Sequence, residues 1–190
     1  MPTLFVIAGC NGAGKTTLSK NLLPQFLGVN EFVNADEIAR GLSPFNAEQA
    51  AFAAGRIMLE RIHELAKAEA NFAIETTLSS KSYAPLFKEM KKNGYEIFLI
   101  FVYLQSAGEA IKRVEQRVKK GGHNIPVHII KRRFERGLKN LAQIYLPICD
   151  GWAILDNTAA TPIFVAEKKA GNFTIHDDSI WNKIITHDQG

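Results

Sequence analysis

The sequence predicts an α/β fold in which a parallel sheet of about five strands is flanked by helices and followed by a small C-terminal hairpin. Strand-like and helix-like runs alternate along the chain, and strands joined by helices pair in parallel through right-handed crossovers. The 190 residues are 46% hydrophobic, which is enough for one domain, residues 1–190, with a substantial core. A glycine-rich loop after the first strand indicates the type of α/β fold.

That loop, residues 9–16 (GCNGAGKT), is a complete phosphate-binding P-loop between a buried strand at 4–8 and a helix that starts at 17–23. Its glycines let backbone N–H groups point at a phosphate, and the helix N-terminus adds partial positive charge. Lys15 is expected to reach the β- and γ-phosphates, and the Thr16 hydroxyl to ligate Mg²⁺. The sequence therefore predicts a P-loop NTPase of the nucleotide-kinase type. The loop residues expected to bind nucleotide are Gly9, Asn11, Gly12, Ala13, Gly14, Lys15, Thr16 and Thr17.

The first half of the chain supplies two more strands, and each one ends in an acidic residue. Residues 31–35 form a short strand that ends at Asp36, and residues 72–74 form the next strand, which ends at Glu75. A long helix is expected after each of these two strands. One runs from its cap Asn46, with Gln49 as the reciprocal cap, to about residue 69, and the other from Ser79 or Ser80 to Asn93-Gly94.

The second half supplies the longest strand and an arginine-rich pair of helices. Residues 95–104 are the longest apolar run and predict a central strand. Ser106 and Glu109 form a capping box for a helix that is broken at Gly121-Gly122. The segments after this break are a helix from Pro126 to about 145, a strand at 152–155, a turn at 156–158, a hairpin at 163–167 and 172–175, and a short helix at 179–186.

Three acidic residues are expected near the P-loop, because ligands bind beyond the carboxyl ends of parallel strands: Asp36, Glu75 and Asp156. Asp36 is our first choice for the general base that takes the proton of an acceptor hydroxyl. It could instead N-cap the helix at 37–40 or bind a metal through water. Glu75 could order Mg²⁺, accept hydrogen bonds from substrate hydroxyls with the help of Thr77, or have a structural role.

The basic charge is concentrated in one segment. Residues 111–140 hold ten Lys or Arg and two Glu, whereas the whole chain has a net charge of only +4. The segment could cover the phosphates of a nucleotide, bind nucleic acid or form a solvated helix face. The P-loop favours the first alternative, and no aromatic-interleaved platform supports single-strand stacking.

We therefore predict a mobile lid at about 107–145, with Gly121-Gly122 as its flexible break. Two or three of its arginines are expected to stabilise the transferring phosphoryl group. The assigned roles are nucleotide binding for Arg113, catalysis for Arg117 and Arg133, and substrate binding for Arg132 and Arg136. His123 could contact the ligand or be inert. Asn157, in the turn after the fifth strand, is expected to bind nucleotide.

Other function classes are excluded by composition. No apolar run approaches the roughly 20 residues that span a bilayer, and we expect the first residues to form a strand and not a signal peptide. Cys10 and Cys149 argue against a disulfide framework and for reduced thiols in the cytoplasm. The histidines lack metal-ligand spacing, so we expect no structural zinc.

The P-loop, Asp36, Glu75-Thr76-Thr77 and the lid arginines, in that order, resemble the zeta toxin family of P-loop kinases over about residues 3–160. The resemblance is closest to its small stand-alone branch. Three stretches carry it: FVNADEIARGLSPFN (32–46), RVKKGGHNIP (117–126) and IKRRFERGLKNL (130–141).

The resemblance implies a phosphotransferase that uses Mg²⁺ and ATP or GTP, with Asp36 as general base on a sugar hydroxyl. It also implies that Glu75 and Thr77 hold a sugar nucleotide. In the toxins of this family the acceptor is UDP-N-acetylglucosamine, phosphorylated on the 3′-hydroxyl of the amino sugar, and an antitoxin protein is a possible partner. The chain departs from those toxins in its short length and in the GGH-x-IP form of its lid.

Two other classes compete with this hypothesis. The first is a nucleic-acid-linked P-loop protein, either a polynucleotide kinase or an ATPase, that uses the basic segment. The second is a nucleotide-dependent switch, and Asp36 together with a full arginine lid argues against it. We expect a small-molecule acceptor and neither a nucleic acid nor a membrane partner.

Overall fold

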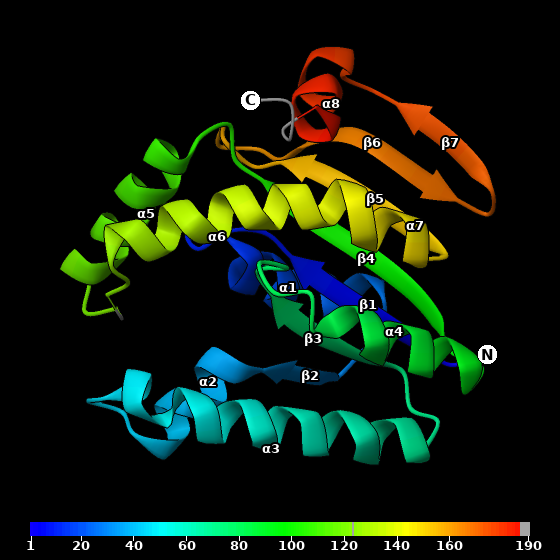
Figure 1. Ribbon diagram of the computed structural model, residues 1–190, viewed down its shortest axis with the longest axis horizontal. Coiled ribbons are helices and arrows are strands. Elements are labelled where there is room, and N and C mark those ends of the chain that lie inside the picture. Colours follow the sequence, from blue (N-terminus) through cyan, green and yellow to red (C-terminus); the bar gives the residue numbers. More distant parts are fainter. Residues whose placement is uncertain (123, 187–190) are drawn as a thin grey trace.

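The computed structural model describes residues 1–122 and 124–186, and it contains one seven-stranded sheet with helices packed against both faces (Figure 1). The strand order is β2-β3-β1-β4-β5-β6-β7. The first five strands in this order are parallel to one another, as predicted. Strand β6 pairs antiparallel with β5, and β7 pairs antiparallel with β6. Their bounds are Thr3–Ala8 (β1), Glu31–Asn34 (β2), Phe72–Thr76 (β3), Glu96–Tyr103 (β4), Gly151–Asp156 (β5), Ile163–Lys169 (β6) and Asn172–Ile175 (β7).

The predicted C-terminal hairpin, β6–β7, extends the main sheet instead of forming a separate unit. Strand β6 pairs antiparallel with β5, because the chain reverses at residues 157–162 without an intervening helix. Such a reversal needs only a short connection, whereas a parallel pairing requires a crossover. The predicted central position of β4 is confirmed, since three strands lie on each side of it.

The helices follow the predicted order. Their bounds are Lys15–Phe26 (α1), Ala35–Leu42 (α2), Ala47–Lys67 (α3), Tyr83–Lys92 (α4), Ala107–Lys119 (α5), Val127–Asn140 (α6), Leu146–Ile148 (α7) and Asp178–Ile185 (α8). A π-helical turn, η1 (Leu141–Tyr145), joins α6 to α7, so this helical segment ends at Ile148 rather than near 145.

The predicted helix caps are correct in part. Ser106 accepts a hydrogen bond from the Glu109 N–H at the start of α5. Asn46 precedes α3 as predicted, but its side chain makes no capping hydrogen bond. Helix α4 begins only after Ser82, so the prediction that Ser79 or Ser80 caps it is wrong. The Ser80 hydroxyl instead accepts from the N–H of Ser82 within the loop.

Strand β1 separates two hydrophobic clusters because its successive side chains point to opposite faces of the sheet. Leu4, Val6 and Ala8 belong to the larger cluster, which includes side chains of α3, α4, α5 and α6. Ile7 belongs to the smaller cluster beneath α1. Burial on both faces fixes the position of β1, and therefore of the loop that follows it.

Candidate active site

The P-loop lies between β1 and α1, and its glycines are required by its backbone. Gly9 has φ 142° and Gly12 has φ 81°, values that side chains other than glycine rarely adopt. A Cβ atom at Gly12 would lie 2.7 Å from the carbonyl oxygen of Ala110 in α5. The loop is therefore packed directly against the first turns of the arginine-rich region.

Lys15 and Thr16 are both held by Glu75 at the end of the neighbouring strand. The buried Lys15 Nζ donates to the Cys10 carbonyl at 3.1 Å and lies 3.7 Å from Glu75 Oε1. The Thr16 hydroxyl donates to Glu75 Oε2 at 2.8 Å. This contact depends on the parallel pairing of β1 with β3, which sets Ile7 opposite Glu75.

The Thr16 hydroxyl and the Glu75 carboxylate fit a Mg²⁺ ion in their donor chemistry. Both are oxygen ligands, and Mg²⁺ is usually held by one or two carboxylates together with substrate phosphates. Among the described residues, no group of three or more His, Cys, Asp or Glu could hold a metal by itself. A Mg²⁺ ion held by Thr16 and Glu75 would take its remaining ligands from water and from the phosphates of a bound nucleotide.

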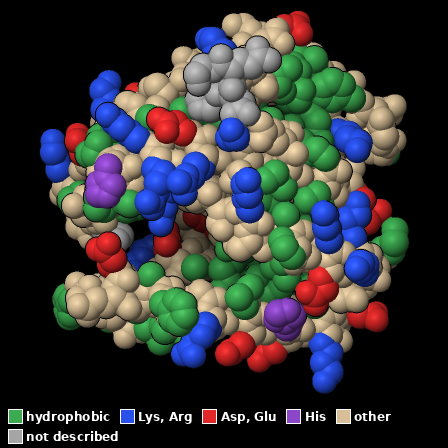
Figure 2. Space-filling view, viewed as in Figure 1, with side chains coloured by type: hydrophobic (Ala, Val, Ile, Leu, Met, Phe, Trp, Pro, Cys, Tyr) green, Lys and Arg blue, Asp and Glu red, His purple; other side chains and the backbone are tan. Residues whose placement is uncertain are grey.

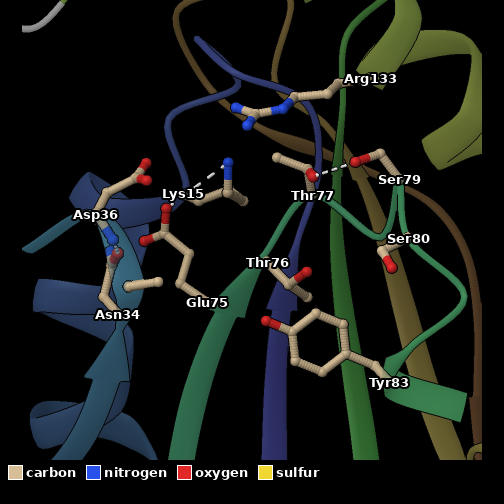
Figure 3. A pocket seen from close by; sticks show the side chains of 11 residues that line it. Lys15, Asn34, Asp36, Glu75, Thr76, Thr77, Ser79, Ser80, Tyr83 and Arg133 are labelled. Carbon is tan, nitrogen blue, oxygen red and sulfur yellow. Dashed lines mark hydrogen bonds and ion pairs between the residues drawn. The ribbon is translucent and has the colours of Figure 1, made fainter. Parts of the chain in front are cut away.

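Asp36 lies in the first turn of α2 and does not cap it. Asn34 is the cap: its side-chain oxygen accepts from the N–H groups of Asp36, at 2.8 Å, and Glu37, at 3.4 Å. The alternative that Asp36 is the N-cap is therefore wrong. Its exposed carboxylate points into the cavity drawn in Figure 3, on the same side as the Lys15 ammonium group.

Three adjoining cavities meet at Asp36. The P-loop cavity, about 410 Å³, is lined by the P-loop together with Arg113 and Arg117. The inner cavity, about 180 Å³, lies beyond Lys15 and Glu75 (Figure 3). The outer cavity, about 460 Å³, lies between α2–α3 and α6. Figure 2 shows a hollow below α6 with Lys and Arg side chains along its upper rim.

The inner cavity is rich in hydroxyl groups. Thr76, Thr77, Ser79, Ser80 and Tyr83 line it, and the hydroxyls of Thr77 and Ser79 lie 2.9 Å apart within hydrogen-bonding distance. Of these residues only Thr77 was predicted to bind substrate. The two serines carried a signal that was interpreted as helix capping, and Tyr83 carried none.

The arginines of α5 and α6 are distributed over the three cavities. Arg117 lines the P-loop and outer cavities, and Arg132 lines the outer one. Arg133 lines the inner and outer cavities, and its Nη1 donates to Asn11 Oδ1 at 3.2 Å. Arg136 is exposed and lines none of the three. The predicted His123 lies outside the described residues.

Two further cationic residues that were not predicted line these cavities. Arg40 lines both the P-loop and outer cavities, and Lys120 lines the P-loop cavity. Arg40 lies four residues after Asp36, which places both on one face of α2. That spacing could have identified it from the sequence.

Asp156 is absent from the site, so the expectation of three acids around the P-loop is wrong. Its buried carboxylate accepts hydrogen bonds from the Thr158 N–H and hydroxyl and from the Gln105 amide. The residue therefore holds the turn after β5. Asn157, in this turn, donates to the Ala13 carbonyl at 2.7 Å and supports the P-loop backbone.

The two cysteines are free and buried. Burial raises the pKa of the Cys10 thiol to about 11 and that of Cys149 to about 12. Both thiols are therefore protonated near neutral pH, and Cys10 serves the P-loop through its carbonyl, which accepts from Lys15. Within residues 1–122 and 124–186, no helix has the length and apolar character needed to cross a bilayer.

The order and geometry of these features can be compared with known proteins. The family model described as zeta toxin matches residues 1–167. The chain belongs to the zeta toxin family. A protein of Haemophilus influenzae described as uncharacterized is 32% identical over 126 residues, which cover 66% of this chain and 88% of that protein.

Two solved structures show the same fold. The AvrRxo1-ORF1:-ORF2 structure with ATP superposes with a TM-score of 0.81 at 18% identity over 99% of this chain. This chain spans only 64% of the length of that neighbour. A chain of the PezAT toxin-antitoxin system of Streptococcus pneumoniae gives a TM-score of 0.68 at 18% identity, covering 98% of this chain and 77% of that one. The predicted P-loop kinase fold of the zeta toxin type is thus confirmed.

Proposed function

We propose that this zeta toxin family protein transfers the γ-phosphoryl group of ATP or GTP to a hydroxyl of a sugar nucleotide such as UDP-N-acetylglucosamine. The observation that carries the proposal is the position of Asp36, which lines the P-loop cavity and both cavities beyond it. Because Asp36 borders the donor cavity and both cavities beyond it, its carboxylate can reach the hydroxyl of an acceptor that lies next to the γ-phosphate of the donor. Geometry of this kind suits a general base.

The P-loop cavity would hold the donor nucleotide. Lys15 and the loop N–H groups would bind its phosphates, with Arg113 and the Asn157-supported backbone at its sides. When bound, Mg²⁺ supplies charge neutralisation at the phosphates, and Thr16 and Glu75 are the residues that would hold it. This assigns to Glu75 the first of its alternative roles.

The inner and outer cavities fit the two chemical parts of a sugar nucleotide, its sugar ring and its phosphates. The hydroxyl-lined inner cavity suits a sugar ring, which presents several hydroxyl groups, and Thr77 is one of its donors. The outer cavity contains Arg40, Arg117 and Arg132, whose guanidinium groups suit phosphates. The phosphates of a sugar nucleotide would face these guanidinium groups, and a neutral sugar has no such anionic group.

In the proposed reaction, Asp36 accepts the proton of the acceptor hydroxyl as that oxygen forms a bond to the γ-phosphorus. The bond from the γ-phosphorus to the bridging oxygen breaks, and the nucleoside diphosphate leaves with that oxygen. Arg117 and Arg133 are the cationic side chains proposed to stabilise the charge on the transferring group. Arg132 is proposed to bind substrate, and Arg136 and His123 stay predictions of the same kind.

The test is incubation of the protein with Mg-ATP or Mg-GTP and a panel of sugar nucleotides, followed by mass spectrometry. We expect UDP-N-acetylglucosamine to gain one phosphoryl group, with no gain in the Asp36→Asn variant. Release of inorganic phosphate without any phosphorylated sugar would refute the proposal and favour an ATPase. Phosphorylation of DNA or RNA ends, with binding that falls steeply with salt, would favour the polynucleotide kinase alternative.

Toxicity and an antitoxin partner are proposals by analogy with the family. Toxicity is tested by expressing the protein alone in the cytoplasm of a bacterial host. Growth arrest that the Asp36→Asn variant relieves would support a toxic kinase activity. Normal growth with accumulated phosphorylated sugar nucleotide would refute toxicity and leave the kinase activity standing.

A further inference from the structure

The loop that follows β3, residues 77–82, supplies three hydroxyl groups of the inner cavity. Those of Thr77, Ser79 and Ser80 line it, and none of the three belongs to a helix or strand. Leu78, between them, has a positive φ of 52° and a completely buried side chain. A leucine adopts this backbone only when its surroundings impose it. A local bond, from the Leu78 N–H to the Thr76 hydroxyl at 3.1 Å, holds one end of the loop, and contacts with the rest of the molecule hold the remainder.

The α6–η1 segment supplies two hydrogen bonds to the backbone of the loop. Asn140 Nδ2 donates to the Leu78 carbonyl at 2.8 Å, and the Tyr145 hydroxyl donates to the Ser80 carbonyl in a short hydrogen bond. Asn140 is 4% exposed and Tyr145 is fully buried, so water does not compete with either side chain for its carbonyl acceptor. These bonds join segments more than 60 residues apart.

The helix also approaches the loop at Gly137. A Cβ atom there would lie 2.8 Å from the Thr77 carbonyl oxygen, closer than real Cβ atoms come to such an oxygen. The absence of a side chain at this position thus permits the approach. Three successive points on one helical segment, residues 137, 140 and 145, therefore contact the loop.

The π-helical turn η1 explains how Tyr145 reaches the loop. In an uninterrupted α-helix, at roughly 100° per residue, Tyr145 would point about 140° away from Asn140. A turn with i→i+5 bonding accommodates about one extra residue, so Tyr145 takes the direction expected one residue earlier, about 40° from Asn140. Such π turns are frequent at functional sites. Here the turn aligns both donors on the face that meets the loop.

We propose that Asn140 and Tyr145 are positioning residues that hold the hydroxyls of the 77–80 loop in the arrangement that binds the acceptor. The proposal rests on the function proposed above and deepens it. Neither residue lines the P-loop cavity, and both act through the loop backbone. Their contribution is therefore to acceptor affinity and not to binding of the donor nucleotide.

The variant that tests this is Tyr145→Phe, which removes one hydroxyl and keeps the ring packed edge-on against Phe87, with the centroids 5.6 Å apart. Its matched control is Tyr95→Phe. The Tyr95 hydroxyl also donates to backbone carbonyls, those of Leu65 and Ala70, but at the opposite end of β3, and its ring also meets a phenylalanine edge-on. Each variant thus loses one tyrosine hydroxyl that donates to backbone carbonyls, and the two hydroxyls lie near opposite ends of β3.

Steady-state kinetics with UDP-N-acetylglucosamine and Mg-ATP give the first readout. Loss of one hydrogen bond of ordinary strength corresponds to about a 3- to 10-fold change. We expect Tyr145→Phe to raise the KM for the sugar nucleotide by that factor, with kcat and the KM for ATP unchanged. Tyr95→Phe should leave all three constants unchanged. The proposal would be overturned if the acceptor KM rose equally in both variants, or if it rose in neither variant.

Hydrogen exchange of the unliganded protein gives a readout that needs no substrate. Peptides covering 77–82 should exchange faster in Tyr145→Phe than in the wild type, while the P-loop and the 65–70 segment stay unchanged. Unchanged exchange at 77–82 overturns the positioning role. A wild-type protein that leaves UDP-N-acetylglucosamine unphosphorylated would refute the proposed substrate instead, and exchange alone would then decide for or against positioning.

Discussion

The nucleotide side and the acceptor side of this site are constructed differently. The nucleotide side is largely one continuous stretch, residues 9–17, whose backbone conformation depends on its own glycines. The acceptor side combines Asp36, the 77–80 loop and Arg133, which come from distant parts of the chain. The first is therefore specified locally, and the second depends on sheet order and on the docking of α6.

The two sides also differ in how they are held. Lys15 is buried and contacts both the P-loop backbone and Glu75. Asp36 is exposed at the mouth of its cavities, and the backbone that carries it is fixed by the Asn34 cap. We therefore expect substitutions on the nucleotide side to abolish binding and chemistry together. Substitutions on the acceptor side should separate acceptor use from nucleotide binding.

The largest effect is expected for Lys15→Ala. This change removes the cation predicted to neutralise the transferring phosphates and leaves Glu75 without its 3.7 Å partner. Phosphorylation should fall by about 1000-fold, near the upper range for loss of one electrostatic stabiliser. Radiolabelled phosphoryl transfer and nucleotide titration measure both losses, with circular dichroism as the check on folding. Near-normal rate and affinity would show that the loop is not the donor site.

The next effect is expected for Asp36→Asn, which is isosteric but not basic. Loss of a general base typically costs ~10²–10⁴-fold, so acceptor phosphorylation should fall by at least ~100-fold while nucleotide affinity stays near normal. Asn34→Ala, which removes the observed cap, should instead cost about 1 kcal/mol of stability. A silent Asp36→Asn variant would refute the proposed mechanism. Nucleotide affinity that becomes abnormally dependent on metal concentration would indicate a role in ordering Mg²⁺.

The sequence was sufficient for the features that depend on local rules. The P-loop, the order of strands and helices and the Ser106 cap all follow from spacing within a few residues. The pairing of β1 with β3, by contrast, is a contact between distant segments, and it brings Glu75 to Thr16.

The missed features depend on contacts between distant segments. Asp156 has the same position at a strand end as Glu75, yet its carboxylate bonds to Thr158 and Gln105. Ser79 and Ser80 could be helix caps by pattern, but their loop is hydrogen-bonded to α6 and η1, and α4 begins only after Ser82. Tyr83 lines the inner cavity from the first position of α4, which starts two or three residues later than predicted. Local patterns do not contain this information.

A third prediction concerns the lid between the two sides. The first turns of α5 are fixed on the P-loop, where Ala110 and Val114 are buried, and α6 is fixed through Ile130 and Leu138. Among the described residues, movement should therefore be confined to about 115–122 and 124–129, narrower than the 107–145 predicted from the sequence. A non-hydrolysable nucleotide at ten times its Kd should slow amide exchange there by about 10-fold if it binds only the closed state. Unchanged exchange across 117–136 at saturating nucleotide would remove the lid.

The smallest effect is expected for a pair of glycine substitutions, Gly137→Ala on the acceptor side and Gly55→Ala outside the site. Both glycines are in helix interiors, where alanine is favoured by about 1 kcal/mol. At Gly55 no atom apart from the neighbouring residues and the backbone of its own helix lies within 4 Å of the added Cβ, so the variant should gain about 0.5–1 kcal/mol of unfolding free energy.

At Gly137 the added Cβ would meet the Thr77 carbonyl at 2.8 Å, and overpacking of this kind typically costs about 1–3 kcal/mol. The cost should cancel or exceed the helical gain, so Gly137→Ala should be less stable than Gly55→Ala by about 1–3 kcal/mol in urea unfolding with unchanged m. Because the displaced atom belongs to the acceptor loop, only Gly137→Ala should also weaken acceptor use. If both variants were stabilised equally with unaltered kinetics, the close approach of α6 would not determine the shape of the loop. The acceptor side would then be as locally specified as the P-loop.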